Sequence, residues 1–280
     1  MSGSAYGDVL RSSPMTRVES MLRASVLVRH ADALCAVGKG AVRLVRQTLA
    51  SSVPIAPPYL GGVPFTASPL SWPCYRDRPL DVIAALPAAL FGSPTPGSLY
   101  FLYDLEEQPS GYDPVERAGS AVFFLPAGTS VTFGEPSRQF HPLLATEYVD
   151  LPHEFDPSIE ALHFSESESD VYDTVCRELR CASLPQHHLL GHSQPLRNSM
   201  QIACEGVSNG VYMGNDLWQK HRSVNDFHRE APHWMLLLQI DHDPGAGILL
   251  EDEGRLYYWI HTNDFREGRL DRTLCIRQSL

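Results

Sequence analysis

Three histidines lie within six positions of the chain, at His187, His188 and His192. Two histidines four residues apart, such as His188 and His192, share one face of a helix and can bind zinc there. However, the intervening Leu-Leu-Gly and the nearby Pro195 predict a turn instead of a helix, and no glutamate completes a His-Glu-x-x-His motif. We therefore predict no metal site. A histidine that orients a loop through a backbone carbonyl is the first interpretation, and ligand binding is the second.

A second group of polar side chains lies at residues 241–247 (DHDPGAG) and 251–253 (EDE). Clustered oxygen atoms of this kind can bind calcium. However, Ala246 stands where the EF-hand loop requires glycine, and the flanking segments have strand patterns instead of helical ones. We interpret the segment as a solvated acidic hairpin loop.

No arrangement typical of covalent catalysis is present in the sequence. It contains neither a Gly-x-Ser-x-Gly motif nor a glycine-rich phosphate-binding loop. Cys204 is expected to point into the protein interior, where cysteines are usually inert. The residues alone therefore leave open whether the chain is an enzyme, and they indicate no cofactor.

The composition is that of a soluble globular protein, with 43% hydrophobic and 20% charged residues. No segment approaches the roughly 20 apolar residues of a membrane-spanning helix, and the N-terminal segment lacks the apolar core of a secretory signal. Six scattered cysteines are too few for a disulfide scaffold. We therefore expect a cytoplasmic protein with reduced thiols and no membrane partner.

The net charge of −11 is unevenly distributed. Residues 1–50 hold seven basic and three acidic residues, a net charge of +4, which leaves −15 for the rest of the chain. An acidic body argues against nucleic acid as the main partner, because phosphate binding requires a basic surface. It suits a basic protein partner, although solubility explains the acidity without any partner.

Periodic patterns predict the elements that position these residues. Apolar residues near a 3.6-residue spacing over residues 15–50 predict two helices, interrupted at Gly38 and Gly40. Six prolines make residues 53–74 an irregular connector. Ser165 and the glutamate three residues later form a capping box, which predicts a helix that ends near Cys181.

Strands are predicted where aromatic and β-branched residues end at glycine or proline or form long apolar runs, at residues 99–104, 121–125, 130–133, 235–241, 255–260 and 273–277. Residues 200–208 and 211–214 are predicted to form a hairpin, because Asn209-Gly210 favours a type I′ turn. The nearly continuous apolar run at residues 235–240 predicts a central strand that is covered on both faces.

A Gly-x-Leu-Tyr-aromatic pattern occurs twice, at residues 97–101 and 254–258, each time after an aliphatic segment. This recurrence indicates a duplicated unit, which would place two similar halves around a pseudo-twofold axis with a shared cleft. We predict an α+β fold of mostly antiparallel β-sheet with flanking helices, in two pseudo-repeated halves with an N-terminal helical extension. The expected division is an extension at 1–52 and a domain at 53–280, whose halves at about 53–150 and 184–280 are joined by a helical connector at 151–183.

From about residue 55 to the C-terminus, the sequence resembles the YwqG-like bacterial proteins, a family otherwise called domain of unknown function 1963. The matching segments are residues 60–64 (LGGVP), 72–73 (WP), 97–104 (GSLYFLYD), 187–191 (HHLLG), 200–214 (MQIACEGVSNGVYMG), 234–241 (WMLLLQID) and 254–260 (GRLYYWI). The resemblance implies a fold but no reaction. Because some relatives are linked to toxin genes, it implies an immunity or partner-binding role as one possibility.

Within this resemblance only His187 aligns with the family's histidine, whereas His188 and His192 stand where relatives vary. The chain also departs from the family pattern at residues 191–193 and 195–197. A ligand that this loop handles in relatives is therefore not carried over to this chain.

Five residues near strand ends or turns form the candidate ligand site: Trp72, His187, Arg197, Gln239 and Asp241. In a groove between the halves they would supply an aromatic wall and polar anchors. Each also has a structural interpretation, such as core packing for Trp72 or ion pairing for Arg197. The first functional hypothesis is a non-catalytic binding protein, of immunity or antitoxin type, with a basic protein partner. The alternative is an enzyme that acts on a small molecule in the groove with His187 as acid/base, and a purely structural module is a third hypothesis.

Overall fold

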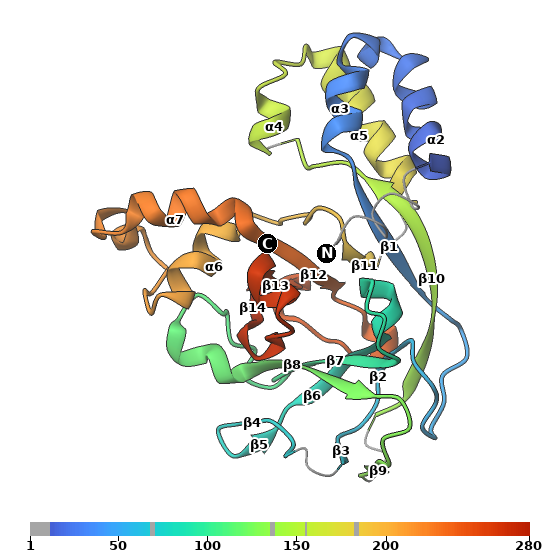
Figure 1. Ribbon diagram of the computed structural model, residues 1–280, viewed down its shortest axis with the longest axis vertical. Helices are drawn as coiled ribbons and strands as arrows, with labels where there is room; N and C mark the ends of the chain where they lie inside the picture. The colour runs from blue at the N-terminus through green and yellow to red at the C-terminus, as the bar shows by residue number, and fades with distance from the viewer. Residues whose placement is uncertain (1–11, 68–70, 135–137, 155, 182–184) are drawn as a thin grey trace.

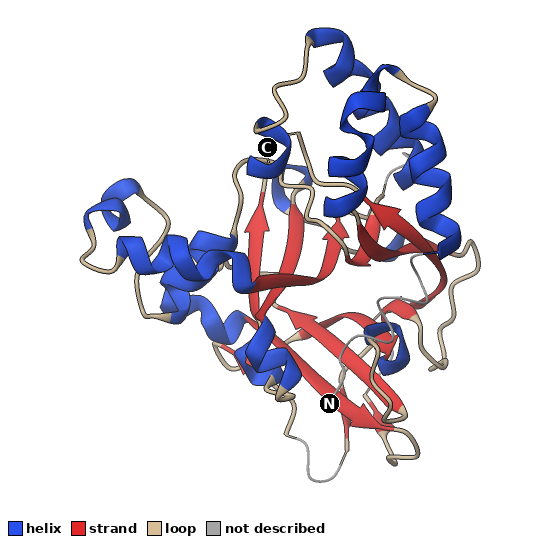
Figure 2. Ribbon diagram, turned by 45° about the horizontal axis from the view of Figure 1, so that its top comes forward, coloured by secondary structure: helices blue, strands red, loops and turns tan. Residues whose placement is uncertain are grey.

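The computed structural model describes residues 12–67, 71–134, 138–154, 156–181 and 185–280. Ten strands form one antiparallel sheet, with helices outside it and a helical lobe at one end (Figures 1 and 2). In sheet order the strands are β14 (Leu274–Gln278), β13 (Arg255–His261), β12 (Trp234–Asp241), β11 (His187–Leu190), β1 (Lys39–Arg46), β10 (Phe140–Asp150), β2 (Tyr59–Gly61), β6 (Asp81–Pro87), β7 (Gly97–Tyr103) and β8 (Ser120–Pro126).

The two ends of this sheet share one hydrophobic core. Phe101 on β7 and Tyr258 on β13 come from opposite ends of the strand order, yet their ring centroids are 5.1 Å apart. The Tyr258 hydroxyl also donates a hydrogen bond to the Leu102 carbonyl at 3.2 Å. The outermost strands β8 and β14 are in contact, so the sheet curls around this core, as large twisted sheets tend to do. We call the core-facing surface of the sheet its inner face and the opposite surface its outer face.

The helical lobe stands on the ends of the long strands β1 and β10 (Figure 1). It consists of α2 (Ser12–Arg23), η1 (Val26–His30), α3 (Ala31–Val37), α4 (Pro157–Glu160) and α5 (Glu166–Arg180). Val18 on α2 and Leu179 on α5 belong to its separate hydrophobic core. Arg29 donates two hydrogen bonds of 2.7 Å to Glu168, and Glu168 also forms the capping box with Ser165. The lobe is therefore held together by its own core and by this ion pair.

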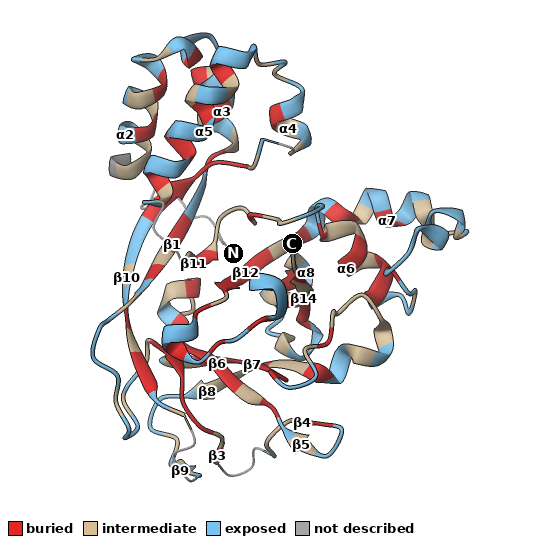
Figure 3. Ribbon diagram, turned by 180° about the vertical axis from the view of Figure 1, so that it is seen from behind, coloured by how far each residue is buried: buried red, intermediate tan, exposed pale blue. Residues whose placement is uncertain are grey.

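A second helical group covers the outer face of β12, β13 and β14, where Cys204 and Trp234 are buried between helix and sheet (Figure 3). It contains α6 (Gln201–Ser208), η4 (Asp216–Lys220), α7 (Val224–Glu230) and η5 (Ala231–His233). The remaining short elements are β3 (Phe65–Thr66), β4 (Cys74–Tyr75), β5 (Arg78–Pro79), η2 (Ala88–Phe91), η3 (Pro114–Gly119), β9 (Thr132–Phe133), η6 (Pro244–Ala246), η7 (Glu251–Glu253), α8 (Thr262–Arg266) and η8 (Leu270–Arg272). Among the described residues, no helix combines the length and apolar character needed to cross a bilayer.

The mainly antiparallel sheet with flanking helices and an N-terminal helix confirms the predicted fold class. The predicted strands and the helix capped by Ser165 are also present. The interpretation of the two halves as repeats stays a prediction. The second helix predicted within residues 15–50 is wrong, because residues 39–46 form β1 between β10 and β11. Val42 and Leu44 are buried on the inner face while Arg43 points to the outer face, which is the two-residue period of a strand.

The predicted hairpin at residues 200–214 is also wrong, because residues 201–208 form α6. Ala203, Cys204 and Val207 are buried at helical spacing. The Asn209-Gly210 pair ends this helix: Gly210 has a φ of 79°, and its N–H bonds to the Val207 carbonyl at 3.0 Å. A left-handed glycine after the last turn is a common helix terminus, and it uses the same positive φ that a type I′ turn requires.

Candidate functional site

Trp72 does not join the other predicted site residues. Its ring packs 4.9 Å from Phe65, within an aromatic cluster that covers the outside of β6, β7 and β8. Its indole N–H donates to the Leu80 carbonyl at 3.0 Å. The inner faces of the two halves, where the shared groove was expected, are filled by the core that contains Phe101 and Tyr258. The structure therefore uses Trp72 for packing in a different part of the molecule.

His187, Gln239 and Asp241 do lie together, on the neighbouring strands β11 and β12. Residues 187–190 form a strand and not the predicted turn, since β11 pairs with β1 on one side and β12 on the other. Arg197 follows in the loop after β11. Its guanidinium donates to the carbonyl oxygens of Ser279 and Leu280 at 2.8 and 3.1 Å, which holds the end of the chain.

Both ring nitrogens of His187 are engaged inside the protein. Its Nδ1 accepts a hydrogen bond from the Asp241 backbone N–H at 3.2 Å, which places the ring proton on Nε2. Nε2 lies 3.4 Å from Oδ2 of Asp243, and the side chain of His187 is 1% exposed. An acid or base must exchange its proton with a substrate, and this ring would have to give up an internal hydrogen bond to do so.

The interpretation of residues 241–247 as a solvated acidic loop is wrong for its two aspartates, because Asp241 and Asp243 are 4% and 2% exposed. Asp243 pairs with Arg46 at 2.8 Å, and Asp241 pairs with Arg255 at 2.7 Å. Burial alone would raise the pKa of Asp243, but the hydrogen bonds from His187 and Arg46 outweigh it and hold the pKa well below its usual value. Buried carboxylates that are paired in this way support the fold.

Side chains on the outer face anchor the loop at residues 191–198. His188 donates to the His192 carbonyl at 3.1 Å, and the Gln239 side chain accepts from the Gln194 backbone N–H at 2.9 Å. The Tyr257 hydroxyl donates to the Gln194 carbonyl at 2.8 Å. Burial lowers the pKa of His188 to about 4, so its ring is neutral at pH 7. The strand histidine thus orients a loop, as the first interpretation of the sequence proposed.

An internal ion pair joins the helical lobe to the same loop. Asp150, at the end of β10, is fully buried and accepts hydrogen bonds from Arg180 Nε and from the His192 backbone N–H, both at 2.9 Å. Burial alone would lower the pKa of Arg180, but the attraction of Asp150 raises it. The lobe, the sheet and the loop therefore meet at one buried carboxylate.

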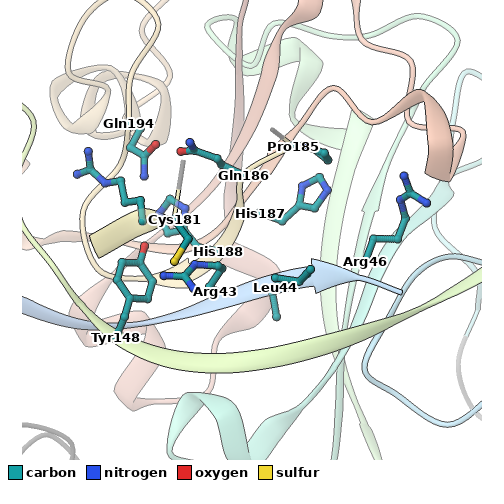
Figure 4. A pocket seen from close by; sticks show the side chains of 12 residues that line it. Arg43, Leu44, Arg46, Tyr148, Cys181, Pro185, Gln186, His187, His188 and Gln194 are labelled. Carbon is teal, nitrogen blue, oxygen red and sulfur yellow. The ribbon is translucent and has the colours of Figure 1, made fainter. Parts of the chain in front are cut away.

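A small pocket lies on one side of the loop, between β1, β10 and β11 (Figure 4). Its volume is about 250 Å³. We call it the arginine pocket, and its lining residues are Arg43, Leu44, Val45, Arg46, Tyr148, Arg180, Cys181, Pro185, Gln186, His187, His188 and Gln194.

A larger cleft lies on the other side of the loop, between the helical lobe and the second helical group. Its volume is about 810 Å³. We call it the lobe cleft, and it is lined by Lys39, Gly40, His153, Asp156, Pro157, Glu160, Leu190, Gly191, His192, Ser193, Pro195, Arg197, Asn198, Ser199, Gln201, Pro232, Trp234, Met235, Leu236, Trp259 and Thr262.

The lobe cleft has an apolar floor and a charged rim. Trp234, Leu236 and Trp259 are buried side chains of β12 and β13 that form the floor. On the lobe side, Asp156 caps α4 and Glu160 is its last residue. Lys39 and Arg197 supply positive charge elsewhere on the rim. An apolar surface with a few charged groups at its edge is typical of binding sites.

His187 and Arg197, which were predicted from the sequence, line these two sites, but the residues that give each site its character were not predicted. Arg43 and Tyr148 stand on β1 and β10, and Trp234 and Trp259 stand on β12 and β13. If residues 39–46 are treated as a strand, the alternation of side chains places Arg43 on the polar face and Val42 and Leu44 on the other face. No signal in the sequence shows that β1 pairs with β10.

The buried cysteines are unsuited to nucleophilic catalysis. Burial raises the pKa of Cys176 to about 11 and that of Cys204 well above its ordinary value. A thiol with a raised pKa is protonated at pH 7 and is a poor nucleophile. Within the described ranges, no three histidine, cysteine or acidic side chains are grouped closely enough to hold a metal ion.

Comparison with known proteins identifies one family. A family model described as a domain of unknown function (DUF1963) matches residues 59–278. No curated protein matches the sequence. The matched region includes nine of the ten sheet strands, with β1 outside it.

Proposed function

The chain belongs to the DUF1963 family, as its resemblance predicted, and from this premise we propose that it is a non-catalytic binding protein. The proposed binding site is the lobe cleft, and the proposed occupant is a segment of a basic protein partner. The observation that carries the proposal is a cleft of about 810 Å³ with an apolar floor and acidic side chains on its lobe side. We propose immunity against a basic toxin as one role of this kind.

The floor of the cleft suits the energetics of protein recognition. Tryptophan is enriched among the residues that dominate binding energy at protein interfaces, and Trp234 and Trp259 both line this floor. Met235 also lines the cleft and is half-buried. Methionine adapts to differently shaped partners because its side chain is flexible and polarizable. The aliphatic part of a bound lysine or arginine would pack on these side chains.

The acidic side chains on the lobe side of the cleft support a basic residue in the occupant. Glu160 is exposed on the rim of the cleft. A bound lysine that packs its aliphatic stem on the floor would place its ammonium group at this rim. The net charge of −11 attracts a basic partner from a distance. Lys39 and Arg197 on the same rim oppose a uniformly basic segment. We therefore expect one or two basic residues among neutral ones.

The surroundings of His187 favour binding over catalysis. Its two ring nitrogens are occupied by the Asp241 backbone and the Asp243 carboxylate, and it is 1% exposed. A proton exchanged with a substrate would have to cross this closed arrangement. The enzyme hypothesis with His187 as acid/base is therefore not the one we propose.

The test is capture of the partner from source cells by the full chain and two charge-reversal variants. Glu160→Lys places a cation on the rim of the lobe cleft. Glu253→Lys makes the same change on an exposed turn outside the cleft and is the matched control. We expect the wild type and Glu253→Lys to retain one stoichiometric basic protein. Glu160→Lys should retain about tenfold less, because juxtaposed like charges are costly. Capture of no protein, or equal capture by both variants, would contradict the proposal.

A further inference from the structure

The arginine pocket carries one positive charge that the described part of the protein does not neutralise. Two of its three arginines are paired with buried carboxylates: Arg180 with Asp150, and Arg46 with Asp243. Arg43 forms no ion pair with any described carboxylate; one of its terminal nitrogens donates to a backbone carbonyl at 2.6 Å, and its Nε has no partner. The pocket therefore presents a guanidinium whose charge is uncompensated.

Neutral hydrogen-bonding groups in the same pocket also lack partners. Tyr148 is 9% exposed, and its hydroxyl points into the pocket (Figure 4) without a hydrogen bond to any described residue. Burial raises the pKa of Tyr148 well above its ordinary value, so the hydroxyl stays protonated and can donate. Gln194 is 7% exposed, and its side-chain amide has no hydrogen bond within the described ranges. These two side chains can therefore offer hydrogen bonds to a ligand in the pocket.

The Tyr148 ring lies close to Arg43. The guanidinium carbon of Arg43 is 5.1 Å from the centroid of this ring, a cation–π contact that favours the position of the guanidinium. β1 and β10, which carry the two residues, pair directly in the sheet. A planar guanidinium held in place is well suited to the two oxygens of a carboxylate.

We propose that the arginine pocket binds a small organic carboxylate, with its carboxylate group on Arg43 and the Tyr148 hydroxyl. A volume of about 250 Å³ holds roughly eight water molecules at about 30 Å³ each, which limits the ligand to about that many non-hydrogen atoms. Val45 and Pro185 also line the pocket and favour a short apolar body over a bare inorganic anion. The proposal for this pocket does not depend on the partner proposed for the lobe cleft.

Titration calorimetry of the full chain at low salt tests the ligand class. The probes are acetate, butyrate, the neutral analogue butyramide and inorganic phosphate. We expect butyrate to bind best and butyramide to bind about tenfold or more weakly, because it lacks the charge that pairs with Arg43. Failure of every carboxylate to bind with a Kd below about 10 mM would overturn the proposal. Butyramide that binds as well as butyrate, or phosphate that binds more tightly, would also overturn it.

Variants of Arg43 and Tyr148 test whether butyrate binds in the arginine pocket. Tyr148→Phe keeps the ring beneath Arg43 and should weaken butyrate binding about tenfold, because it removes one hydrogen bond. Arg43→Gln should weaken it further, whereas Arg229→Gln, at an exposed arginine of α7, should leave it unchanged. Arg43 also holds a backbone carbonyl, so Tyr148→Phe remains decisive if Arg43→Gln folds poorly. Unchanged butyrate binding by Tyr148→Phe would place the ligand elsewhere.

Alkylation of cysteines gives a second measure of where butyrate binds. Cys181 lines the arginine pocket, and Cys74 is exposed in another part of the chain. Iodoacetamide transfers its carbamidomethyl group to a cysteine thiolate, with iodide as the leaving group. Bound butyrate should slow modification of Cys181 but not of Cys74, measured by mass spectrometry of the two peptides. Equal rates at Cys181 with and without saturating butyrate would overturn the assignment.

Discussion

The side-chain oxygen of Gln239 accepts a hydrogen bond from the backbone N–H of Gln194 at 2.9 Å, and thereby ties a central strand to the loop at residues 191–198. The carbonyl of Gln194 is held as well, by the Tyr257 hydroxyl at 2.8 Å and by Arg255 at 2.9 Å. This loop lines both the arginine pocket and the lobe cleft. The two candidate sites therefore share one wall, and the sheet fixes its position.

Removal of the Gln239 amide should loosen this wall. Gln239→Leu keeps the approximate shape of the side chain but leaves the Gln194 N–H buried without an acceptor. We expect the free energy of unfolding to fall by about 1–3 kcal/mol, and the Gln194 amide to exchange its hydrogen faster. Urea denaturation and amide hydrogen exchange measure the two effects. Gln219→Leu, at an exposed position, is the control. Unchanged exchange at Gln194 would show that the hydrogen bond does not hold the loop.

Mild acid should destabilise the protein through His188. Burial lowers its pKa to about 4 in the folded state, against about 6.5 in the unfolded chain. The unfolded chain therefore binds the proton first, and stability is lost as the pH falls from about 6.5 to about 4. The loss from this residue is roughly 3 kcal/mol. Urea denaturation at pH 7 and pH 4 should show a smaller loss for His188→Gln than for the wild type. Equal losses would mean that His188 is not the group that titrates.

A second acid-dependent loss should come from the helical lobe. Hydrogen bonds from Arg29 and Ser165 lower the pKa of Glu168 to about 2, below its unfolded value of about 4.3. This contribution is complete above the unfolded pKa and disappears as the pH falls toward 2. Thermal unfolding should therefore show Glu168→Gln less stable than the wild type at pH 6, with a smaller difference at pH 2.5. A difference that does not shrink would contradict this assignment.

Substitution of Gly111 tests the packing of its loop against the edge strand β14. The loop that contains it runs along β14, where Arg277 donates its backbone N–H to the Ser110 carbonyl at 2.9 Å. A Cβ atom at Gly111 would lie 1.9 Å from the Cys275 carbonyl oxygen, and the residue has a φ of +77°. Gly111→Ala should lower the free energy of unfolding by more than about 3 kcal/mol.

The matched control is Gly128→Ala. Gly128 has a φ of +81°, but a Cβ atom there would meet nothing within 4 Å. This variant should cost only the backbone strain, about 1–2 kcal/mol. Urea denaturation of both variants separates the steric clash from the strain. Equal costs would show that the edge loop moves away without penalty.

Much of the fold could be predicted because several segments have one consistent pattern. The apolar run from Met235 to Ile240 and the capping box at Ser165 each allow a single interpretation. Two segments were ambiguous. Asn209-Gly210 suits a hairpin turn and a helix end equally, because both use a glycine with positive φ. Within residues 39–46, Val42 and Val45 fit the spacing of a helix, whereas Val42 and Leu44 fit the spacing of a strand.

The sites were harder to predict because they depend on strand order. Arg43 and Tyr148 are far apart in sequence, and only the antiparallel pairing of β1 with β10 brings them together. The ion pairing of Asp243 likewise depends on Arg46 and His187, which come from β1 and β11. Local patterns indicate which residues are polar, but they contain no information about which strands become neighbours.

The position of the bound partner shows whether it occupies the lobe cleft. The chain has two lysines: Lys39 on the rim of the lobe cleft and Lys220 at the end of η4, outside the cleft. Partial desolvation lowers the pKa of Lys39 and makes its amine more reactive. An amine-reactive cross-linker applied to the captured complex, followed by mass spectrometry, distinguishes the two positions. We expect cross-links from the partner to Lys39 and few to Lys220. Cross-links to Lys220 alone would contradict binding in the lobe cleft.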